Sequence, residues 1–163
     1  MATLLLNRDI ERFKAQLERT ATEHQVRFTK LHETRAEVIA ELYKRLAQAQ
    51  RCFASLINPM QSVGEPPIEE KRKSAQDAGN AFVTYFDENE IYLDPRLCQQ
   101  IDEFNKQLRE SFLTFFVYVL QDPKSRIPDH TKKWHEAWNK LNDDIPPIRE
   151  EIANSFRQIL GVS

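Results

Sequence analysis

The chain has 163 residues, of which 40% are hydrophobic and 29% charged, and its formal net charge is −2. This length suits one domain with a proper core, and the composition is too apolar for a disordered chain. A small negative charge provides no overall basic field, so composition disfavours nucleic acid as a partner.

The first predicted element is a helix over residues 7–58, a stretch that contains neither Gly nor Pro. Asn7 is a suitable N-cap. Asn58 precedes Pro59 and should end the helix, because a residue before proline avoids the α region. At ~1.5 Å per residue this helix would be about 78 Å long, longer than any other that the sequence predicts.

Apolar residues recur along this first helix at a spacing of seven. One heptad position carries Ile10, Leu17, His24, Leu31 and Val38, and a second carries Ala21, Phe28, Leu42, Ala49 and Leu56. This repeat is typical of a coiled-coil seam. From Val38 onward the stripe widens to include Ile39, Leu46 and Phe53, as in a globular bundle. The two halves of the helix are therefore predicted to lie in different surroundings.

Two shorter helices are predicted next. One begins near Ile68 and ends around residues 87–89; Gly79 inside it favours close contact with another helix. The other has Asp94 as its N-cap and Pro95 at its first helical position, and it runs to about Gln121.

The last helix is predicted beyond a loop bracketed by prolines 123 and 128. Its apolar stripe runs from Trp134 to Ile159 and passes through Pro146 and Pro147, which lack backbone donors. We therefore expect a kink or short break at these prolines with the same face inward on both sides. Gly161 is a suitable terminator.

The predicted lengths favour one all-α architecture. Residues 31–58 match the third and fourth helices, each about 40–48 Å long. We therefore predict an antiparallel four-helix bundle over residues 31–163, with residues 1–30 projecting as a coiled-coil-like arm of the same domain. The apolar runs Leu4–Leu6 and Phe112–Leu120 are too short to cross a membrane. Cys52 and Cys98 lie far apart and favour reduced thiols in a cytoplasmic protein.

The sequence contains no recognisable catalytic or metal-binding motif. Di-iron bundles need Glu-x-x-His pairs, and none of the four histidines has a Glu three residues before it. No HExxH segment occurs either. We predict no metal, no cofactor and no enzymatic activity.

Two weaker site hypotheses remain open. His32 and Arg35 lie one turn apart and are the best candidates for a polar cluster that binds a small ligand; Arg35 could instead extend to solvent or pair with an acidic residue. The short basic runs Lys71–Lys73 and Lys132–Lys133 could contact nucleic acid, with Trp134 next to the second run. Trp134 also lies on the apolar stripe, which favours a place in the core.

One segment resembles a known group of proteins. Residues Phe28 to Tyr43 read F-x-x-L-H-x-x-R-A-E-V-I-x-E-L-Y, which is similar to a segment of uncharacterised prokaryotic helical proteins, where it follows a coiled-coil stretch. The turn at residues 89–95 and the ending from Pro146 to Arg157 fit the same resemblance. It implies a helical fold from about Glu11 onward and no known activity.

Together these patterns favour a helical protein that self-associates or binds a partner helix through its first helix. The predicted contact residues are Ile10, Phe13, Leu17, Ala21, His24 and Phe28. The driving force would be burial of apolar surface, at about 25 cal/mol per Å². The alternatives are a nucleic-acid-binding accessory protein that uses the two basic runs and a small-ligand sensor or enzyme that uses His32 and Arg35.

Overall fold

The computed structural model describes residues 2–60, 62–120 and 130–162, and these residues form helices joined by turns, with no strand among them. The fold is all-α, as predicted. The elements in order are α1 (Ala2–Ile57), α2 (Ile68–Asn89), a 3-10 turn η1 (Glu90–Tyr92), α3 (Pro95–Phe115), a π turn η2 (Phe116–Leu120), α4 (His130–Asn139), a second π turn η3 (Lys140–Asp144) and α5 (Ile145–Leu160). Within the described residues, no helix combines the length and apolar character needed to span a membrane.

Helix α1 begins earlier than predicted. It starts at Ala2, so Asn7 lies inside the helix and the prediction of an N-cap at this residue was wrong. The residues before Asn7 include alanine and three leucines, which are among the best helix formers, and none of them stops the helix. At the other end α1 stops at Ile57, and the N–H of Asn58 still donates to the Ala54 carbonyl at 3.0 Å.

The chain divides into two units by its contacts. The N-terminal unit is Met1–Glu37 and the C-terminal unit is Val38–Ser163. The sequence placed the boundary between residues 30 and 31. The seven-residue spacing runs across both positions, but the widening of the stripe from Val38 onward coincides with the start of burial: Leu31 is 50% exposed, and Val38 is the first core residue at 5%.

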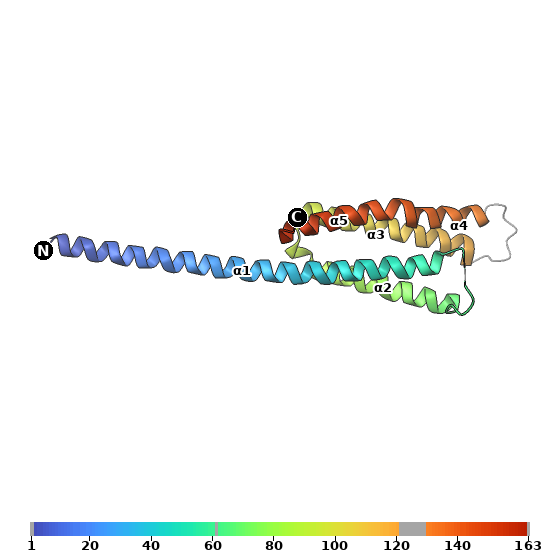
Figure 1. Cartoon of the computed structure of the whole chain (residues 1–163), viewed down its shortest axis with the longest axis horizontal. Coiled ribbons are helices and arrows are strands. Elements are labelled where there is room, and N and C mark those ends of the chain that lie inside the picture. The colour runs from blue at the N-terminus through green and yellow to red at the C-terminus, as the bar shows by residue number, and fades with distance from the viewer. Residues whose placement is uncertain (1, 61, 121–129, 163) are drawn as a thin grey trace. The chain divides into compact units, whose positions relative to one another are not determined.

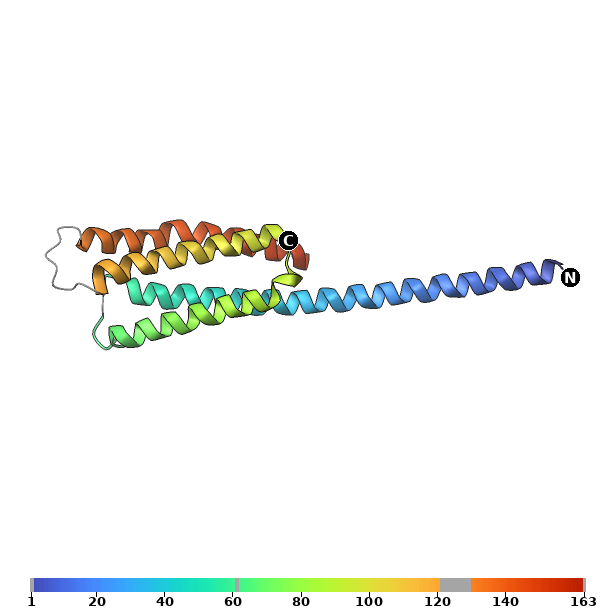
Figure 2. The ribbon, with the colours of Figure 1, turned by 180° about the vertical axis from the view of Figure 1, so that it is seen from behind.

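In the C-terminal unit, α4 and α5 follow one another end to end, and this pair, α2, α3 and the last part of α1 run lengthwise beside one another (Figures 1 and 2). Aromatic rings meet edge to face between them: Phe53 of α1 with Phe112 of α3, and Phe82 of α2 with Phe104 of α3. The largest fully buried side chains are Phe82, Phe104, Phe115, Ile39, Leu42, Leu46, Leu56, Ile57, Leu97, Ile101, Leu141 and Ile145. One hydrophobic core thus connects all the helices of this unit.

Polar contacts join the helices around this core. Arg149 of α5 donates to the Tyr43 hydroxyl at 3.2 Å and to the Gln50 amide oxygen at 3.0 Å, both on α1. Arg45 of α1 donates to the Ala81 carbonyl of α2 at 3.2 Å. These bonds pair side chains that would otherwise leave polar atoms at the core edge without partners.

Local signals set most helix ends. Asp94 is the N-cap of α3 and accepts from the Leu97 N–H at 3.0 Å, with Pro95 at the first helical position. Gly161 ends α5 in the left-handed conformation, with φ 68°, which glycine adopts without strain. Both were predicted. The predicted end of the third helix at Gln121 and the following loop lie outside the described residues.

A kink or short break was predicted within the last helix at Pro146 and Pro147, and the structure has a π turn immediately before these prolines. The turn η3 comes directly before α5, which has Pro146 and Pro147 in its first turn. At its start, two side chains donate to backbone carbonyls: Ser111 Oγ to Ala137 at 2.7 Å and Asn142 Nδ2 to Trp138 at 2.8 Å. Before this turn Ala137 is buried, and Trp134 and Trp138 of the predicted stripe are half-buried and pack against the core.

Candidate functional site

The residues predicted for partner contact form an exposed apolar stripe on the N-terminal unit. We call Ile10, Phe13, Leu17, Ala21, His24 and Phe28 the contact stripe. All six are exposed; Ile10 is 44%, Leu17 53%, Phe13 64% and Phe28 70% exposed. At 3.6 residues per turn the six positions fall on one side of the helix.

The same unit supplies a natural comparison for the stripe. Val26 is equally exposed, at 60%, and the helical period puts it on the side of the helix opposite Leu17 and Phe28. It is an isolated apolar residue, which needs no functional explanation. Continuity along one side distinguishes the contact stripe from ordinary surface residues of similar exposure.

His32 and Arg35, the candidate polar cluster, have different surroundings. The His32 ring is exposed and stacks with the Phe28 ring, with centroids 6.4 Å apart and planes 10° apart. Arg35 is half-buried. The His32 imidazole therefore adjoins the end of the contact stripe, and the structure describes no contact between the two candidate residues.

The basic runs are largely engaged within the chain. Lys71 is 4% exposed and forms an ion pair with Glu65. Arg72 pairs with Glu69 at 2.6 Å. In the second run, Lys133 pairs with Glu136 at 2.6 Å and lies over the Tyr118 ring. Each of these cations is neutralised by a neighbouring carboxylate, which leaves Lys73 and Lys132 as the exposed members of the two runs.

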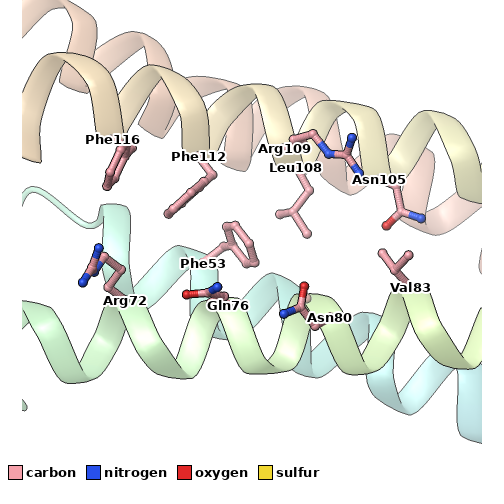
Figure 3. Close-up of a pocket in the computed structure, with 11 residues that line it drawn as sticks. Phe53, Arg72, Gln76, Asn80, Val83, Asn105, Leu108, Arg109, Phe112 and Phe116 are labelled. Carbon is pink, nitrogen blue, oxygen red and sulfur yellow. The ribbon is translucent and has the colours of Figure 1, made fainter. Parts of the chain in front are cut away.

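The C-terminal unit contains a groove that the sequence did not predict. It has a volume of about 330 Å³ and runs between α2 and α3, with α1 beneath it (Figure 3). Phe53, Val83, Leu108, Phe112 and Phe116 supply its apolar lining. Its polar lining consists of Arg72, Gln76, Asn80, Asn105 and Arg109.

Gly79 is the one sequence feature that points to this groove. A Cβ at this position would lie 3.2 Å from Cε2 of Phe53, so the missing side chain allows the Phe53 ring to lie against α2. Among the described lining residues none carries a carboxylate, thiol, imidazole or hydroxyl group. The groove offers apolar surface, amides and two guanidinium groups, a combination suited to binding.

Titratable groups are perturbed at the surface ion pairs. A hydrogen bond from Lys71, with a second from the Ser62 backbone, lowers the pKa of the Glu65 carboxyl. Hydrogen bonds from Arg45, Lys140 and Lys133 likewise lower the pKa values of Glu41, Glu110 and Glu136, respectively. Stable surface pairing explains these shifts without a catalytic role.

Cysteines and possible metal ligands are dispersed. Cys52 and Cys98 are free and half-buried, and burial raises the pKa of the Cys98 thiol. A raised pKa lowers the thiolate fraction and therefore the reactivity of this sulfur. Over residues 2–60, 62–120 and 130–162, no three His, Cys, Asp or Glu side chains are grouped so as to hold a metal ion.

Comparisons with known proteins identify no family for this chain. No protein-family model matches the chain, and no curated protein or solved structure matches it. The contact stripe and the groove are therefore interpreted from their own geometry.

Proposed function

We propose that this chain is a non-enzymatic helical protein that self-associates, or binds a partner helix, through the contact stripe. The observation that carries the proposal is the exposure of Ile10, Phe13, Leu17 and Phe28, each at least 44%, on one side of a continuous helix. An amphipathic helix gains stability when a second apolar surface covers its stripe. The heptad spacing favours another helix as that surface.

The proposal includes a finer architecture. Residues 38–57 of α1, together with α2, α3 and the pair α4 and α5, would make up an antiparallel four-helix bundle, and the contact stripe would form a coiled coil. The shared core and the cross-helix bonds of the C-terminal unit support the bundle. The two free thiols fit a reducing compartment, and we place the protein in the cytoplasm on that ground.

The structure gives less support to the alternative functions. A nucleic-acid interface would need its lysines and arginines free to meet phosphates. Lys71 is buried against Glu65, and Arg72 and Lys133 are paired with carboxylates. Likewise, His32 and Arg35 do not line the groove that the C-terminal unit offers to a small molecule.

Sedimentation equilibrium of the full chain tests the proposal. The wild-type protein should have a mass above that of a monomer, and the double variant Leu17→Asp/Phe28→Asp should shift toward the monomer. Burial of one Leu or Phe contributes about 1.5–3 kcal/mol, so two losses in each copy should weaken association by more than about a hundredfold.

Val26→Asp is the matched control, because it introduces the same charge on the opposite side of the same helix. It should keep the wild-type mass. All three positions are exposed, so helicity measured by circular dichroism should be unchanged in every variant. A wild-type monomer that also binds no helical partner, or a double variant that associates like the wild type, would show the proposal to be wrong.

A further inference from the structure

The charges along the contact stripe distinguish between the two ways in which a second copy could pair with it. In the heptad of the N-terminal unit, Ile10, Leu17, His24 and Leu31 share one seam position, and Lys14, Ala21, Phe28 and Arg35 share the other. Lys14, Ala21 and His24 are exposed. In a parallel pair each seam residue faces the same residue of the second copy. In an antiparallel pair the residues at one seam position face those at the other.

A parallel pair would place like groups together inside the seam. Lys14 would face Lys14 of the second copy, Arg35 would face Arg35, and His24 would face His24. A charged pair of the same sign in a partly buried layer is destabilising. Ala21 would also face Ala21, which leaves little side-chain volume in that layer, whereas Phe28 would face Phe28 in the next.

An antiparallel pair removes these conflicts. With Leu17 opposite Phe28 of the second copy, Ala21 falls opposite His24, Lys14 opposite Leu31 and Ile10 opposite Arg35. Each small residue then meets a large one, and the Lys14 stem can lie along Leu31 with its ammonium group in water. Beside this seam, Glu11 falls opposite His32 of the second copy, so a carboxylate meets an imidazole.

The register is also restricted. A shift by one heptad in one direction would set Lys14 against His24 of the second copy. A shift in the other direction would require Lys14 to pair with Val38, which is 5% exposed because it packs in its own core. In the remaining register no layer sets two basic side chains together, and the half-buried Arg35 falls opposite Ile10.

We infer that the partner of the contact stripe is a second copy of this chain, bound antiparallel with Leu17 opposite Phe28. This inference rests on the proposed function, because it requires that the stripe mediates association. It goes further in naming the occupant, the orientation and the layers. The match of charge and size carries the argument, since in this register Lys14 meets Leu31, Arg35 meets Ile10, and no layer sets two basic side chains together.

Spin labels test the orientation without altering the seam. Cysteines replace Arg12 or Thr22, both exposed and outside the seam, in a Cys52→Ser/Cys98→Ser background. In either orientation the two Thr22 labels lie at nearly the same position along the axis of the pair. The two Arg12 labels lie level in a parallel pair but roughly 30 Å apart along the axis in the antiparallel pair, at ~1.5 Å per residue. We expect a clearly longer distance for Arg12 than for Thr22 in double electron–electron resonance.

Disulfide formation gives a second, independent readout in the same background. A mixture of the Leu17→Cys and Phe28→Cys chains should form a covalent dimer on mild oxidation. Leu17→Cys alone should not, because its two sulfur atoms would lie about 16 Å apart along the axis, beyond disulfide reach.

Each outcome has a distinct meaning when read with the sedimentation mass. Equal Arg12 and Thr22 distances in a protein that sediments as a dimer, or cross-linking of Leu17→Cys alone, would overturn the antiparallel inference and leave self-association intact. A monomeric mass that binds an added helical partner would overturn the second copy as occupant. A monomeric mass without any partner would overturn both the inference and the proposed function.

Discussion

The indole of Trp134 connects two helices. Replacing it with phenylalanine should lower the free energy of unfolding by more than the smaller ring alone would explain. Its Nε1 donates to the Ile57 carbonyl at 2.6 Å. Ile57 is the last residue of α1 and is fully buried, and the last carbonyls of a helix have no partner within that helix. Trp134 therefore supplies a hydrogen bond that this helix end otherwise lacks.

The expected effect follows from the energetics of a buried acceptor. A hydrogen bond contributes about 1 kcal/mol net, and a buried carbonyl left without a partner costs about 1–3 kcal/mol. We expect Trp134→Phe to lower the free energy of unfolding by about 2 kcal/mol beyond the loss of apolar area. With a urea m-value of about 2 kcal/mol per M, the midpoint should fall by about 1 M.

Trp138 provides the matched control. It lies one turn further along the same helical segment and also packs half-buried against the core, but its indole makes no described hydrogen bond. The chain has two tryptophans, so each single variant retains one fluorescent reporter for the urea titration. If Trp134→Phe and Trp138→Phe lose equal stability, the bond to Ile57 contributes nothing and the reasoning is refuted.

Two further predictions concern the C-terminal unit. Ser111→Ala removes the fully buried donor to the Ala137 carbonyl and should cost about 1–2 kcal/mol in chemical denaturation, whereas an unchanged midpoint would contradict this role. Glu65→Gln should destabilise most at neutral pH, because the lowered pKa of Glu65 gives stability that is complete above the ordinary value of 4.5 and is lost as the pH falls below it. The gap between wild type and variant should therefore narrow in acid, and a gap independent of pH would show that the pair with Lys71 is not responsible.

Where a structural feature depends on neighbouring residues, the sequence was sufficient to predict it. Ile68 begins α2, Asp94 caps α3 and Gly161 ends α5, each through a signal contained in a few residues. The start of α1 was missed because a good N-cap residue also tolerates a helix interior when the preceding residues are helix formers. The residue type at Asn7 does not by itself show whether it caps a helix or lies inside one.

Features that depend on several helices at once could not be predicted in this way. The seven-residue spacing on α1 continues on both sides of Val38 and does not by itself locate the first buried residue, although the widening of the stripe begins at Val38. The groove needs Phe53, Gly79 and Phe112 from three helices, and only Gly79 carries a local signal. For the contact stripe, the sequence predicted residues that prove exposed, whereas its partner remains a proposal.

The π turn η3 (Lys140–Asp144) affects how the chain tolerates changes in length. Ser111 and Ala137, both small and buried, meet where α3 and α4 lie against each other. A π turn holds one residue more than an α-turn, so deletion of a single residue there would restore a regular helix. Because the extra residue is accommodated within the turn, this deletion would leave Ala137 facing Ser111. Closing the turn to regular helix with all its residues kept would instead rotate Trp138 toward Ser111. The π turn thus keeps Ala137 against Ser111 while holding one more residue, and the protein should tolerate loss of one residue in this turn better than loss of one residue from the regular part of α4 or α5.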